Sequence, residues 1–103
     1  MKILISLITV SMLLISISSF ADTDSCEQAT FFYKKGQYHS AKTILAPLVK
    51  KGEACAEYYM GVMYEEGAGV KKTESNRKKG VSLIESAKTK GYPAAIKFMN
   101  SYH

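Results

Sequence analysis

The chain has 103 residues, of which 47% are hydrophobic, 22% are charged and 11% are aromatic. Fourteen lysines and arginines against nine acidic residues give a formal net charge of +5, spread over short clusters such as Lys34-Lys35 and Lys71-Lys72. The sequence contains no nucleic-acid-binding motif, so this mild excess is typical of a solvated helical surface. Attraction to anionic lipid or to an acidic protein is the alternative.

The N-terminal stretch predicts a secretory signal peptide over residues 1–21. Lys2 supplies a positive start, the apolar run 3–17 follows, and Ser19-Phe20-Ala21 places small residues where a signal peptidase cleaves. The alternative is an uncleaved membrane anchor, but the apolar run is shorter than the ~20 residues that span a bilayer. We therefore expect export, to the periplasm or as a fully secreted protein, and one mature domain over residues 22–103.

Cys26 and Cys55 are the two cysteines of the chain. In a small exported domain, an even number of cysteines indicates a disulfide, and closing this loop of 29 residues is expected to contribute ~3–4 kcal/mol. A redox or metal-binding pair is the alternative. The sequence offers no C-x-x-C motif for it, and only His39 and His103 as further nitrogen ligands. We expect neither a metal nor a cofactor.

The mature part of the chain predicts an all-α fold of five helices, because no stretch shows the alternation of a strand. The first two helices are expected over about 24–35 and 38–51, ending at Gly36 and Gly52, with Asp24 as the first N-cap. Pro47 lies inside the second and predicts a kink or an early end there.

The third helix is expected over about 53–65, with a buried stripe formed by Ala56, Tyr59, Met60, Met63 and Tyr64. Gly61 in its interior costs ~1 kcal/mol relative to alanine, which indicates that another helix packs close to the backbone at this point. A glycine-rich turn over 66–70 follows, from which Val70 is expected to insert into the core.

The polar stretch 71–79 predicts a loop that leads into a fourth helix over about 77–90, with Thr73 or Ser75 as the N-cap. Its inward residues are expected to be Val81, Leu83, Ile84 and Ala87. Gly91 ends this helix. Pro93 begins a fifth helix over about 93–102, at a position where its missing N–H is harmless.

Parts of this arrangement repeat at a distance of 39 residues, since Gly52, Ala56 and Met60 correspond to Gly91, Ala95 and Met99. A fixed period of roughly 20–50 residues is typical of stacked helical hairpins. Such arrays are usually binding scaffolds.

The repeated residues resemble the signature of Sel1-like repeats, α/α hairpins related to tetratricopeptide repeats. In this sequence the signature residues are Ala56, Met60, Gly61, Tyr64, Gly67, Gly69, Val70, Ala87, Gly91 and Ala95. The resemblance implies a short solenoid of about two hairpins and a C-terminal capping helix, with the disulfide linking the starts of adjacent first helices. The chain departs from the family pattern in its longer period, in lacking the usual acidic residue after the glycine turn, where Thr73 lies, and in having Gly80 in place of alanine on the second helix.

The resemblance also implies that the first helix of each hairpin lines a concave side on which partners bind. The candidates for that surface are the fifth helix and the residues Phe31, Phe32, Glu57, Tyr58 and Met63. Tyrosine and methionine suit such a surface because they supply apolar contact with few rotamers to freeze. Phe31, Phe32 and Met63 are core residues in the alternative interpretation, whereas Tyr58 is expected to be exposed.

The sequence lacks the common catalytic motifs. Ser75 and Lys78 match the S-x-x-K spacing of penicillin-recognising enzymes, but the companion K-T-G is absent. We therefore expect a non-catalytic protein-binding module of the periplasm, and the resemblance to Sel1-like repeats implies a role as an adaptor, a regulator of envelope signalling or a toxin-immunity protein. The alternatives are a secreted effector that binds a host protein and, less favoured, an enzyme acting on the cell wall or on β-lactams.

Overall fold

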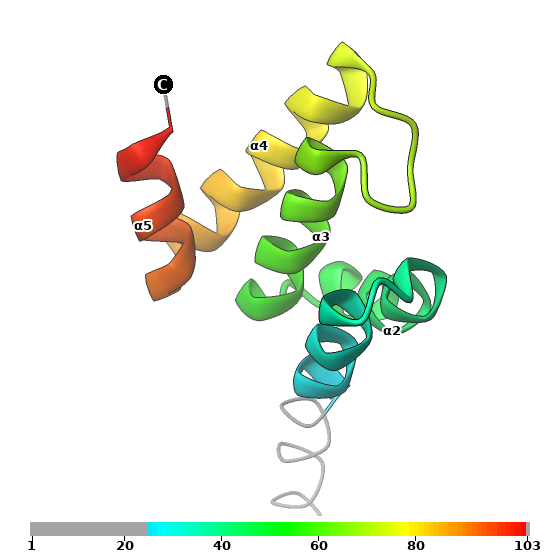
Figure 1. Cartoon of the computed structure of the whole chain (residues 1–103). Helices are drawn as coiled ribbons and strands as arrows, with labels where there is room; N and C mark the ends of the chain where they lie inside the picture. The colour runs from blue at the N-terminus through cyan, green and yellow to red at the C-terminus, as the bar shows by residue number, and fades with distance from the viewer. Residues whose placement is uncertain (1–24, 103) are drawn as a thin grey trace, which may run out of the picture.

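The computed structural model describes residues 25–102, which form five helical segments joined by short turns and contain no strand (Figure 1). The predicted all-α class is therefore confirmed for this part of the chain. The signal peptide predicted over 1–21, the N-cap predicted at Asp24 and the terminal His103 lie outside the described residues.

The first helical segment covers 25–34. It is followed by α2 (Tyr38–Lys50), α3 (Ala54–Glu66), α4 (Glu74–Thr89) and α5 (Pro93–Ser101). The glycines predicted to end helices, Gly36, Gly52 and Gly91, do so with φ between 79° and 85°, and Gly67 of the predicted turn ends α3 in the same way with φ 78°. Glycine is favoured at these positions because a β-carbon disfavours this left-handed conformation.

Two predictions need correction, one about the end of α2 and one about the start of α4. Pro47 does not end α2, which continues to Lys50. The missing N–H of Pro47 removes only one helical hydrogen bond near the C-terminus, and its ring lies on the exposed side. The polar stretch 74–79 is helix and not loop, because Thr73 caps α4: its side-chain oxygen accepts the N–H of Asn76 at 3.1 Å.

The helices enclose two neighbouring hydrophobic clusters. The first is formed by the segment 25–34, α2, α3 and the turn after it, and contains Cys26, Ala29, Ala41, Leu45, Leu48, Ala56, Met60, Met63 and Ala68. The second joins α3, α4 and α5 through Val62, Ile84, Ala87 and Ala95. Because α3 contributes to both clusters, it is the central helix of the fold, with α2 and α4 packed against it and α5 packed against α4 (Figure 1).

The closest packing is between α3 and α4, as the interior glycine of α3 predicted. A β-carbon added to Gly61 would lie 2.7 Å from the carbonyl oxygen of Gly80 and 2.7 Å from Cγ1 of Ile84. Val70, in contrast, is only half-buried and belongs to neither cluster. Ala68 fills the core below the turn instead. Within residues 25–102 no helix is both long and apolar enough to cross a bilayer.

Candidate functional site

A disulfide between Cys26 and Cys55 joins the segment 25–34 to the first turn of α3, with the two Cα atoms 6.5 Å apart. The pairing predicted from the sequence is confirmed. The bond brings together the starts of two helices that the chain separates by 29 residues. It also fixes the position of the side chains that surround it.

Five tyrosines form a continuous row of ring contacts beside the disulfide, which we call the tyrosine row. In order along the row they are Tyr38, Tyr33, Tyr59, Tyr58 and Tyr92, with successive centroids 5.9, 6.0, 5.1 and 5.5 Å apart. Rings at these distances attract each other beyond the effect of area burial. The row connects α2, the segment 25–34, α3 and the start of α5, and each of its members is half-buried.

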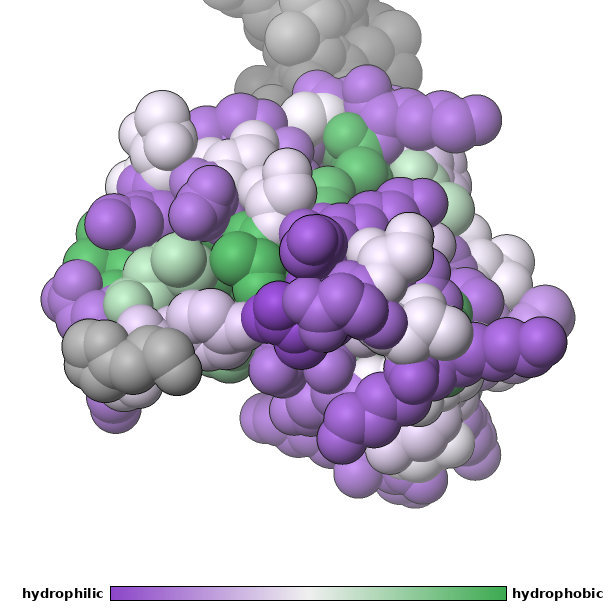
Figure 2. Space-filling model, turned by 90° about the horizontal axis from the view of Figure 1, so that it is seen from above, coloured by the Kyte–Doolittle hydropathy of each residue, from purple (hydrophilic) through white to green (hydrophobic). Residues whose placement is uncertain are grey.

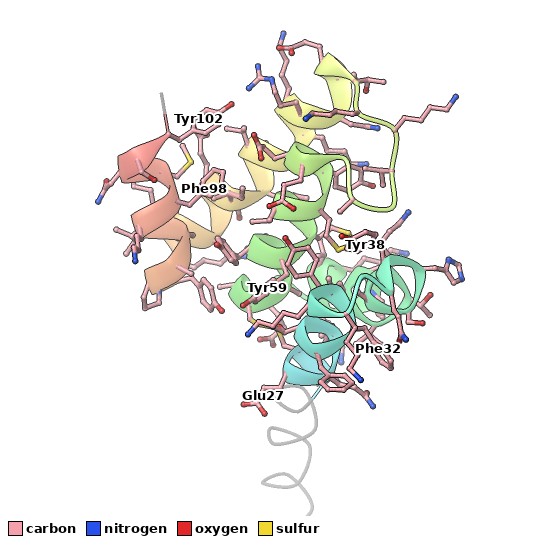
Figure 3. The ribbon with its side chains drawn as sticks, in the orientation of Figure 1. Glu27, Phe32, Tyr38, Tyr59, Phe98 and Tyr102 are labelled. Carbon is pink, nitrogen blue, oxygen red and sulfur yellow. A yellow bond between two sulfur atoms is a disulfide. The ribbon has the colours of Figure 1, made fainter. Side chains whose placement is uncertain are left out.

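A pocket of about 410 Å³ lies next to this row and over the disulfide, and we call it the disulfide pocket. Its lining comes from the segment 25–34, α3 with its N-cap, and the N-cap of α5, and consists of Cys26, Glu27, Thr30, Glu53, Cys55, Tyr59 and Tyr92. Figure 3 labels Glu27 on the segment 25–34 and Tyr59 on α3. The pocket thus takes side chains from three parts of the fold that α2 and α4 separate along the chain.

The pocket combines neutral aromatic walls with an acidic rim. The Tyr92 hydroxyl donates to Cys55 Sγ at 3.7 Å, so this ring lies against the disulfide. Burial raises the pKa of Tyr92, as it does that of Tyr58 in the adjoining row, and both phenols therefore stay protonated at neutral pH. Glu27 and Glu53 are exposed at the rim.

Of the residues predicted for the partner-binding surface, Glu57 is a wrong prediction, and for Met63 the alternative of a core residue is confirmed. Met63 is completely buried in the first cluster, and Glu57 is only 7% exposed. Phe32 is half-buried against the first cluster, and Tyr58 is half-buried against the second rather than fully exposed. Phe31 is the member of this set that stands out in solvent, at 54% exposure.

Glu57 faces inward because α4 supplies partners for its carboxylate. The Ser86 hydroxyl donates to Glu57 Oε2 at 2.9 Å, and the Lys90 ammonium donates to Oε1 at 2.8 Å. Lys90 also donates to the carbonyl oxygen of Gly52 at 2.8 Å. This clamp joins α3, α4 and the turn after α2. Glu57 is therefore part of the helix packing and not of a free surface.

The residues that resemble a Sel1-like signature lie in the helix packing and in the turns. Ala56, Ala87 and Ala95 are completely buried, Met60 and Gly61 are buried, and Tyr64 is half-buried. Gly69, like Gly67, has a positive φ in the turn after α3. Lys79 of α4 places its ammonium 4.8 Å from the centre of the Tyr64 ring, a cation–π contact across the two helices.

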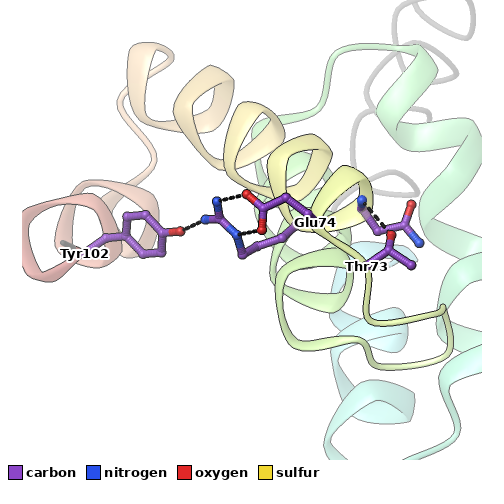
Figure 4. A network of polar contacts seen from close by, with 5 residues as sticks. Thr73, Glu74 and Tyr102 are labelled. Atoms are coloured by element: carbon purple, nitrogen blue, oxygen red, sulfur yellow. Dashed lines mark hydrogen bonds and ion pairs between the residues drawn. The ribbon is translucent and has the colours of Figure 1, made fainter.

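The opposite end of the molecule carries a polar network that joins α4 to the end of α5 (Figure 4). The Arg77 guanidinium donates to both oxygens of Glu74, at 3.0 and 2.6 Å, and to the hydroxyl of Tyr102. Seen from above, this end is mostly hydrophilic, and hydrophobic residues show only in small patches (Figure 2). Ser75 and Lys78, the S-x-x-K pair, are both exposed there.

Among residues 25–102 the structure shows no group of three or more histidine, cysteine, aspartate or glutamate residues placed to hold a metal ion. Comparison of the chain with models of protein families, with curated proteins and with solved structures finds no match. The disulfide pocket is therefore described by its own chemistry. No single motif in the sequence points to it, because its lining residues are spread from Cys26 to Tyr92 and only the fold brings them together.

Proposed function

We propose that this chain is an exported, non-catalytic protein-binding module of the periplasm, built from Sel1-like helical hairpins, and that partners bind at the disulfide pocket and the adjoining tyrosine row. The observation that carries this proposal is the row itself. Five half-buried tyrosines in successive ring contact bring partly exposed aromatic side chains from four parts of a small domain into one row. Tyrosine is enriched at the centres of protein interfaces.

Two further observations support the compartment and the scaffold. A disulfide persists in oxidising compartments, so the Cys26–Cys55 bond is compatible with export, which the N-terminal sequence predicts. The residues shared with Sel1-like repeats pack the helices or shape the turns, and the side chains around the pocket lie outside that set. In this proposal the repeat residues form the scaffold, and the tyrosines and glutamates around the pocket contact the partner.

The proposal is tested by affinity capture from a periplasmic fraction. The wild-type chain is compared with Tyr92→Ala, which removes a ring at the end of the tyrosine row, and with Phe31→Ala, which removes an exposed ring outside the row and the pocket. We expect one identified protein to bind the wild type and Phe31→Ala but to bind Tyr92→Ala at least about tenfold more weakly, as befits an aromatic hot spot. The binding is then reproduced with purified components.

Circular dichroism of each variant controls for folding. Equal retention of the partner by all three proteins would place the interface elsewhere, and absence of any reproducible partner would count against a binding role.

A further inference from the structure

The disulfide pocket has an electrostatic character opposite to that of the whole chain. The net charge of the chain is +5, yet the charged residues that line the pocket are the two glutamates Glu27 and Glu53. Neither side chain has a hydrogen-bond or ion-pair partner within the described part of the chain. The nearby ammonium of Lys90 is held by Glu57 and the carbonyl of Gly52. The pocket therefore presents two carboxylates that have no ion-pair partner among residues 25–102.

The rings of Tyr59 and Tyr92 line the same pocket. The face of an aromatic ring attracts a cation, and a carboxylate attracts it more strongly. A planar cation can bind a ring and a carboxylate at the same time, because it stacks on the ring and donates hydrogen bonds to the carboxylate from its edge. A volume of about 410 Å³ is at the small end of the range for ligand sites, and it is suited to one side chain with its flanking backbone.

We propose that the disulfide pocket takes the arginine side chain of a partner protein, with the guanidinium stacked on the tyrosine rings and hydrogen-bonded to Glu27 and Glu53. Arginine fits better than lysine because the compact, strongly hydrated ammonium of lysine cannot stack. This inference rests on the proposed binding function and names the chemistry of the partner.

The occupant comes from another protein and not from a second copy of this chain. The sequence contains one arginine, Arg77, and its guanidinium is already bound to both carboxylate oxygens of Glu74 and to the hydroxyl of Tyr102. A second copy would have to break that network to present this side chain. The lysines that a copy does expose have the less suitable head group.

The test measures binding of short capped peptides, Gly-Arg-Gly and the same peptide with citrulline in place of arginine, to the exported, oxidised protein by NMR titration. Citrulline keeps the shape of arginine and removes its charge. We expect the arginine peptide to bind with a dissociation constant of about 1 mM, and the citrulline peptide at least about tenfold more weakly. A third peptide, with lysine in place of arginine, should bind with an affinity between those of the other two.

The matched variants are Glu27→Gln combined with Glu53→Gln, and Glu85→Gln as the control. All three glutamates are exposed, so neither protein should lose its fold, and Glu85 lies on α4 outside the pocket. We expect the double variant to weaken arginine binding at least about tenfold and the control to leave it unchanged.

Equal binding of the arginine and citrulline peptides, or no arginine binding at about 10 mM, overturns the inference. Association of the protein with itself that the double variant abolishes also overturns it, in favour of a second copy as the occupant. Binding of the captured protein partner to the double variant distinguishes the arginine pocket from the more general binding function proposed above. If it binds wild type and double variant equally well, the arginine pocket is wrong while the binding function stands.

Discussion

Gly61 of α3 and Gly80 of α4 face each other where the two helices cross, and each occupies the space that a β-carbon on the other would need. A β-carbon on Gly61 would lie 2.7 Å from the carbonyl oxygen of Gly80, and one on Gly80 would lie 2.7 Å from the backbone nitrogen of Glu65. Both clashes involve backbone atoms, which cannot turn aside as a side chain can. Close packing of α3 and α4 therefore depends on glycine at both positions.

Replacing Gly61 with alanine should destabilise the protein. The steric cost of overpacking is about 1–3 kcal/mol, and the better helix propensity of alanine returns only ~1 kcal/mol of it. Because the clash is with backbone that cannot move aside, we expect the steric cost to be about 2–3 kcal/mol and the net loss in the free energy of unfolding, measured by urea denaturation, to be about 1–2 kcal/mol. Ser82→Ala, an exposed site on α4, is the control and should change stability by less than ~0.5 kcal/mol. A Gly61→Ala protein as stable as the wild type would show that the helices separate without penalty.

The disulfide should supply a large part of the stability of this small domain. In the chain-entropy model, a bond that closes 29 residues stabilises the folded state by ~3–4 kcal/mol, because it restricts the unfolded chain. A reductant should therefore lower the denaturation midpoint strongly. The variant Cys26→Ala with Cys55→Ala should show the lowered midpoint without reductant and should not respond to it. If reduction left the wild-type midpoint unchanged, helix packing alone would account for the stability.

The clamp on Glu57 should be sensitive to loss of its cation. Lys90→Met removes the ammonium and leaves the carboxylate buried beside Ser86 without a counter-charge. The lysine side chain is 40% exposed, so solvent screens part of the interaction, and we expect a loss of about 1–2 kcal/mol rather than the full cost of breaking a buried pair. Lys88→Met, at an exposed position two residues earlier, provides the matched control in the same urea experiment. Equal effects of the two substitutions would indicate that Glu57 is solvated.

Stability should fall at alkaline pH because of Tyr33. Its hydroxyl donates to Glu66 Oε2 at 2.8 Å, and burial together with this hydrogen bond raises the pKa of Tyr33. The unfolded chain loses the tyrosine proton near pH 10, before the folded chain does. The stabilising contribution is therefore complete below about pH 10 and is lost as the pH rises above that value.

The measurement is the denaturation midpoint between about pH 8 and 11 for the wild type and for Tyr33→Phe. The phenylalanine variant should be less stable at neutral pH, because the bond to Glu66 is lost, but its midpoint should fall less steeply with pH. No cysteine of the described chain is free, so thiol ionisation does not complicate the comparison. Parallel curves for the two proteins would mean that other tyrosines cause the decline.

Local features of the chain were predictable from the sequence because they depend on neighbouring residues. Helix ends follow from the tolerance of Gly52 and Gly91 for positive φ, and the start of α5 follows from the fixed φ of Pro93. Thr73 was one of two candidate caps for α4, and the choice needed the structure. The disulfide was predictable because the chain contains two cysteines, and the close helix crossing because Gly61 interrupts an otherwise good helix.

The tertiary structure alone decided which side chains are free to meet a partner. Helical periodicity identifies a buried stripe only when a helix packs on one side, and α3 packs against α2 and α4 at once. Met63 and Glu57 consequently face inward, one into the first cluster and the other toward Lys90. The disulfide pocket was equally hidden in the sequence, because the long-range packing of three helical segments creates it.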